Sequence, residues 1–311
     1  MKILTSFDEL RTIQANIVYA LGTFDGIHLG HQTVIGRAVA MADTCEAVTV
    51  VVTFDAHPLS ILAPQKVPPQ LLQREHRPEI LEALGVDYML ELPMNAELLS
   101  ITASDFLVYL TQGVTVRGVV VGENFTFGKG GIGTPALIRD TLEPKGINVT
   151  VMRLEGHEAV PGHVSSTYIR GAIMRGDVAL VRTLLGRAYR FTGTVIMGDQ
   201  RGRTLGFPTL NFLFPKEMAL PADGVYVNRV CIDGEWFGGV GNMGDNPTFA
   251  NQYHRFEVHL FDFDRDVYGA TATVEFLQFL RGEVKFSSLD ELITQMKIDE
   301  QQARDYLASM D

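Results

Sequence analysis

The stretch IVYALGTFDGIHLGHQ, residues 17–32, joins an apolar, strand-like run to the start of a helical pattern. His28 and His31 lie at this junction with three glycines around them. In a parallel α/β sheet, ligands bind at the carboxyl ends of the strands. A helix that begins there presents unpaired backbone N–H groups and the positive end of its dipole. The stretch therefore predicts a parallel sheet with a phosphate-binding turn after this strand.

The same alternation of strand-like and helical patterns continues to about residue 186. Strand-like runs cover 17–24, 47–54, 86–92, 116–122 and 147–154, and helical patterns cover 28–42, 71–84, 104–112, 135–142 and 166–185. Runs such as VTVVV are apolar on both faces, as strands are when helices cover both sides of a sheet. We therefore expect an α/β domain with a Rossmann-like parallel sheet over residues 1–186.

After residue 186, short alternating strands follow one another without intervening helices. They cover 193–198, 224–232, 235–242, 256–263 and 270–279, and the Asp-Gly pair at 233–234 is a strong hairpin signal. Ser288 and Glu291 have capping-box spacing before a helix that carries Leu292, Met296 and Ala303 on one side. This pattern predicts a small antiparallel β-barrel domain with a C-terminal helix over residues 187–311.

Composition narrows the class of protein. The chain has 311 residues, of which 46% are hydrophobic and 20% charged, and a formal net charge of −11. This charge disfavours nucleic acid and anionic membranes as partners, whereas small molecules stay possible ligands. Cys45 and Cys231 form no CxxC pair, so neither a disulfide framework nor a zinc site is expected. With no secretory or membrane-spanning pattern we expect a cytoplasmic protein, and the sequence leaves its oligomeric state open.

Two segments of the first half suit phosphate binding. His28 and His31 stand one helical turn apart and can both donate hydrogen bonds to the same oxygens, while glycines let the backbone approach the ligand. The segment VSSTYIRGAIMRGD, residues 164–177, places Ser165, Ser166 and Thr167 at a helix start with Arg170 one turn later. Each segment also has a purely structural interpretation. His28 and His31 could be ordinary polar residues near a helix start, and the serines and threonine of 164–177 could only cap a basic helix.

The second half contains a different candidate site. In GTVIMGDQRGRTLGFPTLNF, residues 193–212, Thr209 and Asn211 alternate with Leu210, so both oxygens would face one side of a strand and could share a magnesium ion. Glu257 stands within the strand FEVHLFDF, where a carboxylate near a magnesium-bound triphosphate could act as a general base. The alternatives are an ordinary turn after a strand and a solvent-facing glutamate.

These motifs carry a resemblance to known families. The pattern GxFDGxHxGH resembles the signature of the nucleotidyltransferase superfamily, and GRTLGFPTLNF, PADGVYV, GNMGDNPTF, FEVHLFDF, DVYG and RGEVKF, in this order, resemble riboflavin kinases. Over nearly its full length the chain resembles the bacterial bifunctional riboflavin kinase/FMN adenylyltransferases, also called FAD synthetases. The resemblance implies that riboflavin and ATP give FMN and ADP, and that FMN and a second ATP give FAD and pyrophosphate, with Mg²⁺ as cofactor.

The resemblance also implies roles for particular residues. It predicts catalytic roles for Glu257, His28, His31 and Arg170, flavin contacts for Asn124 and His57, and magnesium ligation by Thr209 and Asn211. The residues that it predicts to bind ATP are Gly22, Phe24, Asp25, Gly30, Ser166, Thr167, Gly198, Arg203, Gly206 and Pro208. Three places depart from the expected pattern: Ala56 in TFDAHP, the loop GKGGIG, and Gly282 in RGE.

Three other functions fit parts of the sequence. GKGGIG, residues 128–133, satisfies the GxGxxG pattern, and Glu155 follows the next strand, so a dinucleotide-dependent dehydrogenase is one alternative. The glycine motif comes late in the sheet, which speaks against it. The barrel could instead bind flavin without kinase activity, although such a module would not need Glu257. An aminoacyl-tRNA synthetase would need a basic RNA-binding surface.

Overall fold

In a computed structural model, the structure describes residues 1–153, 156, 158, 162–198, 202, 205–245 and 254–310. The chain forms two compact units. The first consists of Met1–Pro68 and Arg74–Ser165, and the second of Pro69–Gln73 and Ser166–Asp311. Within the described residues, no helix combines the length and the apolar character that crossing a bilayer requires.

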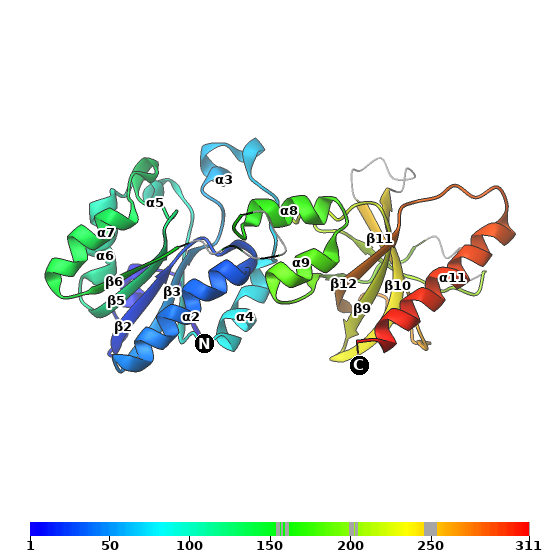
Figure 1. Ribbon diagram of the computed structural model, residues 1–311, viewed down its shortest axis with the longest axis horizontal. Helices are drawn as coiled ribbons and strands as arrows, with labels where there is room; N and C mark the ends of the chain where they lie inside the picture. Colours follow the sequence, from blue (N-terminus) through cyan, green and yellow to red (C-terminus); the bar gives the residue numbers. More distant parts are fainter. Residues whose placement is uncertain are drawn as a thin grey trace. The chain divides into compact units, whose positions relative to one another are not determined.

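The first unit is built on a six-stranded parallel sheet with the strand order β1-β4-β3-β2-β5-β6 (Figure 1). The strands are β1 (Lys2–Leu4), β2 (Asn16–Leu21), β3 (Ala47–Phe54), β4 (Tyr88–Leu92), β5 (Thr115–Gly122) and β6 (Asn148–Met152). From β2 the chain proceeds to β3 on one side, and β5 lies on the other side of β2. The carboxyl ends of β2 and β5 therefore form the switch point at which such sheets bind ligands.

Helices cover both faces of this sheet, as the sequence predicts. The long helix α2 (Leu29–Thr44) contacts β2, β3 and β5, so closely that a Cβ on Gly118 would lie 2.2 Å from the Met41 sulfur. Residues of α6 and α7 share a core cluster with alternate residues of the strands. The remaining helices of this unit are α1 (Phe7–Leu10), α3 (Leu59–Leu62), α4 (Arg77–Ala83) and α5 (Ala96–Ser100), with α6 at Ala103–Thr111 and α7 at Pro135–Leu142.

Two predicted helices differ from the structure. The pattern at 71–84 is helical only from Arg77, after a 3-10 turn, because Leu71 and Leu72 are buried in the second unit. The pattern at 166–185 forms two helices, α8 (Ser166–Met174) and α9 (Val178–Leu185). Gly176 lies between them with a φ of 79°, a conformation that ends α8 and that glycine adopts without strain.

The second unit is an antiparallel, curled half-barrel with the strand order β7-β12-β9-β10-β11-β8. The strands are β7 (Tyr189–Thr194), β8 (Leu210–Leu213), β9 (Gly224–Ile232), β10 (Glu235–Asp245), β11 (His254–Leu260) and β12 (Thr271–Arg281). Asp233 and Gly234 both have positive φ in the β9–β10 turn, as an Asp-Gly hairpin requires. The barrel interior is filled by packed aromatic rings, among them Phe191, Phe256 and Phe276.

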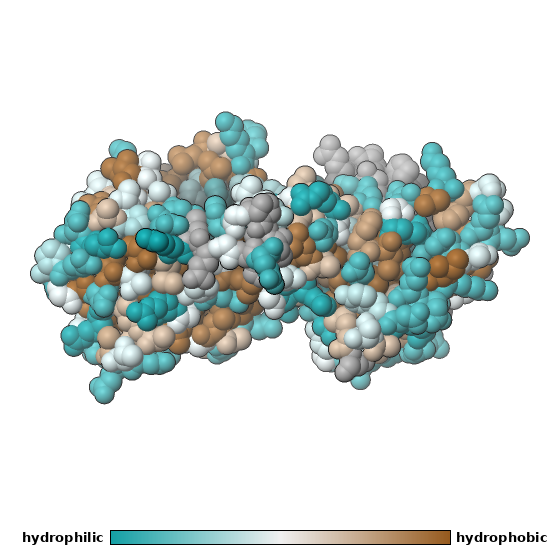
Figure 2. Space-filling view, in the orientation of Figure 1, coloured by the Kyte–Doolittle hydropathy of each residue, from teal (hydrophilic) through white to brown (hydrophobic). Residues whose placement is uncertain are grey.

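The last helix, α11 (Leu289–Ala308), packs on the outer face of the barrel. Ser288 caps it by accepting a hydrogen bond from the Glu291 backbone N–H, at 3.2 Å. Ala303, Tyr306 and Leu307 pack with residues of β9 and β12, and a Cβ on Gly238 would lie 2.5 Å from Leu307 Cδ1. The surface over α11 is mostly hydrophilic (Figure 2). The predicted architecture, a parallel α/β sheet followed by an antiparallel barrel and a C-terminal helix, is confirmed.

Candidate functional site

The turn after β2 has an unusual backbone. Phe24 and Ile27 have φ angles of 47° and 40°, and Gly26 between them has a φ of 78°. Left-handed conformations are costly for residues with a side chain, and such strain is concentrated at functional sites. A Cβ on Gly22 would lie 2.7 Å from the Phe24 ring, so glycine at this position lets the turn fold back on itself. Asp25 lies in the same turn, in the 3-10 segment Asp25–Ile27.

The two histidines lie side by side at the start of α2. His28 is the N-cap of the helix, and its Nδ1 accepts a hydrogen bond from the His31 backbone N–H at 3.3 Å. The two rings are stacked with their centroids 3.7 Å apart. A Cβ on Gly30 would lie 3.2 Å from His28 Cε1, so this glycine leaves room for the ring. His28 is only 4% exposed, and His31 is half-buried.

The environment of His31 favours its neutral form. Burial lowers the pKa of the His31 imidazole well below its ordinary value, and the adjacent His28 lowers this pKa further. The Phe24 ring packs edge-on against His31, at a centroid distance of 5.3 Å. His31 Nδ1 is buried and has no hydrogen-bond partner among the described residues. A neutral imidazole can still donate one hydrogen bond to a phosphate oxygen.

The carboxyl ends of β5 and β6 face the first turn of α2. Asn124 follows β5, and a Cβ on Gly122 would lie 3.3 Å from the Asn124 amide oxygen. Gly30 and Gly122, together with Met152 and Val164, line a crevice of about 20 Å³. Asn124 thus lies next to the switch point where β2 and β5 end side by side, and its flavin contact stays a prediction.

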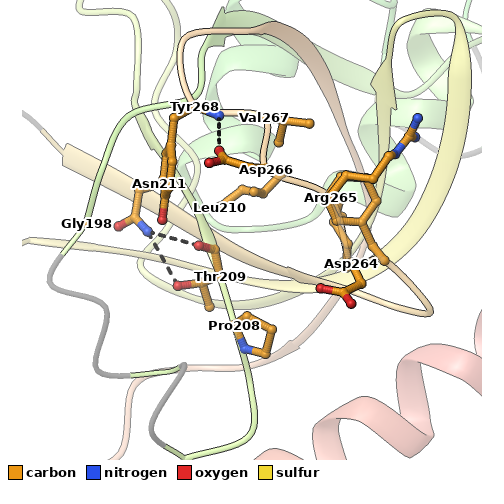
Figure 3. A pocket seen from close by; sticks show the side chains of 12 residues that line it. Gly198, Pro208, Thr209, Leu210, Asn211, Asp264, Arg265, Asp266, Val267 and Tyr268 are labelled. Atoms are coloured by element: carbon orange, nitrogen blue, oxygen red, sulfur yellow. Dashed lines mark hydrogen bonds between the residues drawn. The ribbon is translucent and has the colours of Figure 1, made fainter.

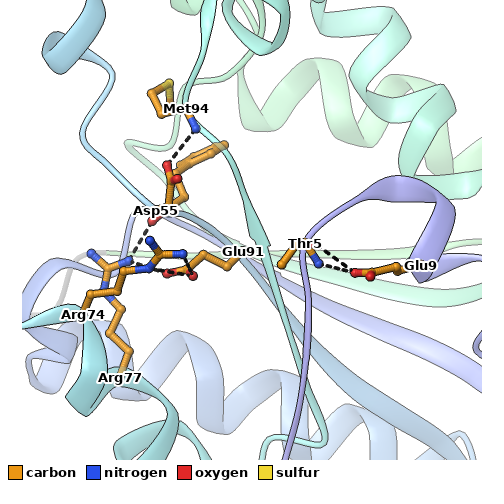
Figure 4. Close-up of polar contacts among 8 residues, drawn as sticks. Thr5, Glu9, Asp55, Arg74, Arg77, Glu91 and Met94 are labelled. Atoms are coloured by element: carbon orange, nitrogen blue, oxygen red, sulfur yellow. Dashed lines mark hydrogen bonds and ion pairs between the residues drawn. The ribbon is translucent and has the colours of Figure 1, made fainter.

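Charged side chains fix the segment that carries His57. This segment follows β3, and its Phe54 carbonyl accepts a 2.7 Å hydrogen bond from Arg77 Nη1 (Figure 4). Asp55 accepts a hydrogen bond from the Met94 backbone N–H, also at 2.7 Å. Glu91, buried within β4, pairs with Arg77 and with a second arginine, Arg74.

His57 itself turns toward the chain that follows it. Its Nδ1 accepts a 3.1 Å hydrogen bond from the Leu59 backbone N–H at the start of α3. The side chain is half-buried. The hydrogen bonds to Phe54 and Asp55 therefore fix the end of β3 and the segment that carries His57, the histidine for which the resemblance predicts a flavin contact.

The helix α8 carries the second predicted phosphate-binding group. Ser166 is its first residue, Thr167 is exposed, and Arg170 follows one turn later. The Arg170 Nε donates a 2.7 Å hydrogen bond to the Pro69 carbonyl. All three residues and Pro69 belong to the second compact unit, whereas His28 and His31 belong to the first.

A first barrel cavity, of about 300 Å³, surrounds Thr209 and Asn211 (Figure 3). Gly198 and Pro208 also line it, and the segment Asp264–Tyr268 forms its rim. Asn211 is 3% exposed, and its Nδ2 donates to Thr209 Oγ1 at 3.4 Å, so the two side chains are in contact through the amide nitrogen.

Two features of this cavity concern Asn211. The amide oxygen of Asn211 is buried and has no hydrogen-bond partner among the described residues. A Cβ on Gly198 would lie within 2.4 to 2.5 Å of the Asn211 amide atoms, so only glycine fits there. Gly206, another predicted ATP-binding residue, has a φ of 85° and open space around it. Arg203 lies outside the described residues, as does Glu155 of the alternative dinucleotide motif.

A second barrel cavity, of about 600 Å³, lies between the outer face of the barrel and α11. The register of the sheet places Asn211, Glu257 and Asn242 opposite one another on β8, β11 and β10, so their side chains share one face. Glu257 is half-buried and lines this second cavity. Thr209 lines both cavities and therefore marks the point where they meet.

His259 holds the segment between the two cavities in place. Its Nδ1 lies 2.8 Å from the Pro208 carbonyl oxygen, and its ring packs against the edge of Phe207. His259 stands two residues after Glu257 and also lines the second cavity. It thereby fixes the backbone next to Thr209.

Both halves of the chain match known protein families. A family model described as FAD synthetase matches residues 10–168, and one described as riboflavin kinase matches residues 185–307. The chain is 38% identical to the bifunctional riboflavin kinase/FMN adenylyltransferase of Bacillus subtilis over 96% of this chain and 94% of that protein. It is 32% identical to the protein of the same name from Escherichia coli K12, over 98% of both chains. The chain belongs to the bifunctional riboflavin kinase/FMN adenylyltransferase family.

A solved structure supports the fold over the same length. The crystal structure titled as a macrolide-efflux protein from Streptococcus pneumoniae is 32% identical in sequence, with a TM-score of 0.89. The match covers 97% of this chain and 98% of that chain. The two chains therefore share the same fold over nearly their full lengths.

Several residues of the barrel site are absent from the sequence prediction. Asn242, His259, Arg281 and Asp299 all line the second cavity. The sequence could have indicated His259, because it lies two residues after Glu257 in the same strand and its side chain therefore points to the same face. Asp299 lies seven residues after Leu292, so it interrupts the apolar side of the predicted helix with a carboxylate. The glycine-rich loop of the dehydrogenase alternative has a structural explanation: a Cβ on Gly128 would lie 2.5 Å from the Ala103 backbone nitrogen.

Proposed function

We propose that the barrel unit phosphorylates riboflavin with ATP to give FMN and ADP, and that the parallel-sheet unit supplies the histidines for transfer of AMP from ATP to FMN. The products of the second step are FAD and pyrophosphate. Membership of the family supports the presence of both activities in this chain, and the positions of the two family matches support their division along it. A cytoplasmic location, where ATP is available, is part of the proposal.

The kinase site rests on one observation: Glu257 lines the second of two cavities that differ in character and that meet at Thr209. The first cavity has a polar rim with Asp264, Arg265 and Asp266, and we assign the nucleotide to it. The second is larger and contains apolar side chains such as Phe207, Val240 and Phe286, which suit the flavin ring system. Riboflavin in the second cavity would bring its 5′-hydroxyl to Glu257, which accepts the proton as oxygen attacks the γ-phosphorus of ATP.

The residues of the first cavity fit a magnesium ion. Thr209 and Asn211 each bring an oxygen to this cavity, and the amide oxygen of Asn211 has no hydrogen-bond partner among the described residues. Magnesium prefers oxygen ligands together with several waters or phosphate oxygens. Among the described residues, no cluster of three or more histidine, cysteine or acidic side chains offers another metal site. Bound there with ATP, magnesium would neutralise charge on the phosphates. Gly198 and Pro208 border the same cavity.

Adenylyl transfer needs positioning rather than a protein nucleophile. A phosphate oxygen of FMN attacks the α-phosphorus of ATP, and pyrophosphate leaves. His31 and His28 would donate hydrogen bonds to triphosphate oxygens at the start of α2, where the backbone N–H groups and the helix dipole also favour anions. Gly22, Phe24, Asp25 and Gly30 shape that turn, and we assign flavin contacts to Asn124 and His57. For Ser166, Thr167 and Arg170, triphosphate contacts remain a proposal that the family resemblance supports.

Replacement of one carboxylate tests the division of labour. Glu257→Gln keeps the shape of the side chain but removes the base, so FMN formation should fall by more than about 100-fold. The same protein, supplied with FMN, ATP and magnesium, should form FAD at the wild-type rate. Both products are separated by chromatography after incubation of the purified full chain.

The alternatives give different outcomes in this experiment. Retention of FMN formation by Glu257→Gln would remove Glu257 from its assigned role. A barrel that only binds flavin would give no FMN from riboflavin in the wild-type protein. A dehydrogenase would release no pyrophosphate from ATP when FMN is supplied.

A further inference from the structure

An ion pair joins α11 to β12 at the wall of the second barrel cavity. Arg281, the last residue of β12, donates from Nε and Nη2 to both oxygens of Asp299, at 2.7 to 3.1 Å. The Asp299 side chain is 4% exposed, and Gln295 donates a further 2.9 Å hydrogen bond to it. A bidentate, buried pair of this kind has a well-defined geometry. We call the pair of Arg281 and Asp299 the latch.

The latch contacts three walls of the cavity. Leu292, Met296 and Asp299 are spaced along one side of α11, and all three line the cavity. The remaining Arg281 donor, Nη1, bonds the Gly282 carbonyl at 3.0 Å, and the guanidinium lies 5.8 Å from the centroid of the Phe286 ring. The segment from Glu283 to Phe286, which connects β12 to α11, also lines the cavity. One arginine therefore bonds the strand end, the connecting segment and the helix together.

We propose that the latch sets the distance between α11 and the barrel and thereby determines the fit of riboflavin. This inference rests on the proposed kinase site in the second cavity. Arg281 and Asp299 act as positioning residues: Asp299 has its oxygens engaged by Arg281 and Gln295, so its effect reaches the ligand through Leu292 and Met296 on the same helix. The nucleotide cavity shares none of these residues. Loss of the latch should therefore weaken riboflavin binding and leave ATP binding unchanged.

The test compares two variants of the full chain. Asp299→Asn keeps the size of the side chain but removes the charge, and the KM for riboflavin should rise about tenfold or more with little change in kcat or in the KM for ATP. Titration of riboflavin fluorescence should show the same loss in affinity without turnover. Arg281→Lys keeps the positive charge but loses the bidentate hydrogen bonding to Asp299. The KM for riboflavin should therefore rise less than in Asp299→Asn.

A second ion pair on the same helix provides a matched control. Arg304 of α11 pairs with Asp262, just after β11, at 3.0 Å. Neither residue lines the cavity. Asp262→Asn thus removes an ion pair between α11 and the barrel but should leave the KM for riboflavin unchanged. A thermal melt and the binding of ADP verify that each variant is folded.

The outcomes separate the latch from the proposed function. If the wild-type chain forms no FMN from riboflavin, the kinase assignment fails. If the wild-type chain is a kinase, an unchanged riboflavin KM in folded Asp299→Asn overturns the latch alone. An equal rise in Asp262→Asn would also overturn it, because both pairs would then act only by holding the helix. If Asp299→Asn does not fold, Arg281→Lys decides by the same criteria.

Discussion

His31 shows how its surroundings can set the protonation state of a side chain at the start of a helix. Its imidazole is kept neutral by burial and by the adjacent His28, which together lower its pKa well below the ordinary value of 6.5. A neutral ring at the start of a helix still donates one hydrogen bond, and the helix supplies the positive potential. The contribution of His31 to anion binding should therefore depend little on pH near neutrality.

A titration tests this state of His31. In the ligand-free protein, the NMR signal of its imidazole should titrate at a clearly lower pH than that of an exposed histidine, because burial and the adjacent His28 lower its pKa. In the unfolded chain the ring takes up a proton below about pH 6.5, so the unfolded state binds more protons and the protein loses stability as the pH falls through this region. The stability that the neutral ring contributes is fully present at pH values above about 6.5.

The variant His31→Gln provides the control. Its urea midpoint should change less between about pH 7.5 and about pH 5.5 than that of the wild type, because glutamine does not titrate. An imidazole signal that titrates near pH 6.5, as in an exposed histidine, would contradict the description of this side chain.

Residues that share a strand could be predicted, whereas residues brought together across strands could not. Thr209 and Asn211 converge because they alternate on one segment, and this is visible in the sequence. The opposition of Asn211, Glu257 and Asn242 depends on the register of β8, β11 and β10, which the sequence does not fix by itself. The pairing of Arg281 with Asp299 likewise depends on where α11 docks.

At the scale of elements, apolar periodicity identified most helices but not the partners that they pack against. Leu71 and Leu72 fit a helical pattern, yet they are buried in the barrel unit and the helix begins at Arg77. The pattern over 166–185 is continuous in the sequence, and Gly176 divides it. A glycine within a helical pattern can end a helix or be tolerated in it, and packing decides between the two.

Two glycines of α2 allow a prediction about this element. A Cβ on Gly30 would lie 3.2 Å from the His28 ring, whereas a Cβ on Gly36 would contact nothing within 4 Å. Gly30→Ala should therefore displace the His28 ring and reduce FAD formation from FMN by about tenfold. Gly36→Ala should raise the free energy of unfolding by roughly 0.5 to 1 kcal/mol, because alanine favours the helix, and should leave the activity unchanged.

The measurement is the rate of FAD formation together with a thermal melt for each variant. Gly36→Ala controls for the general effect of alanine on α2. Wild-type FAD formation in Gly30→Ala would show that the position of the His28 ring does not limit the reaction.

At the scale of the molecule, the chain divides where its packing changes. The compact units separate at Ser165 and Ser166, because α8 and α9 pack with the second unit, while the two family matches end at 168 and begin at 185. The domain boundary that the sequence suggests, near residue 186, stays a prediction. The change from alternating strands and helices to consecutive strands is visible in the sequence. The sequence does not show whether the connecting helices α8 and α9 pack with the first unit or with the second.

The separation of the two chemistries leads to a prediction about the whole protein. Each barrel cavity is lined only by residues of the second unit, and the paired histidines belong to the first unit. On the proposed assignments the two steps use different sets of residues, so we expect FMN to pass through solution from the barrel unit to the unit that carries His31. A mixture of Glu257→Gln, which lacks the proposed kinase base, and His31→Gln, which lacks the proposed phosphate donor, should convert riboflavin to FAD after a lag.

The lag reports the accumulation of FMN in solution, and it should shorten when the proportion of His31→Gln protein is raised. Each variant alone should give at most one product from riboflavin, which chromatography of FMN and FAD measures. If the mixture makes FMN but no FAD, although Glu257→Gln forms FAD from added FMN at the same concentration, then FMN does not pass through solution. In that case the phosphorylated product stays bound to the chain that made it, and the two activities are coupled within one chain.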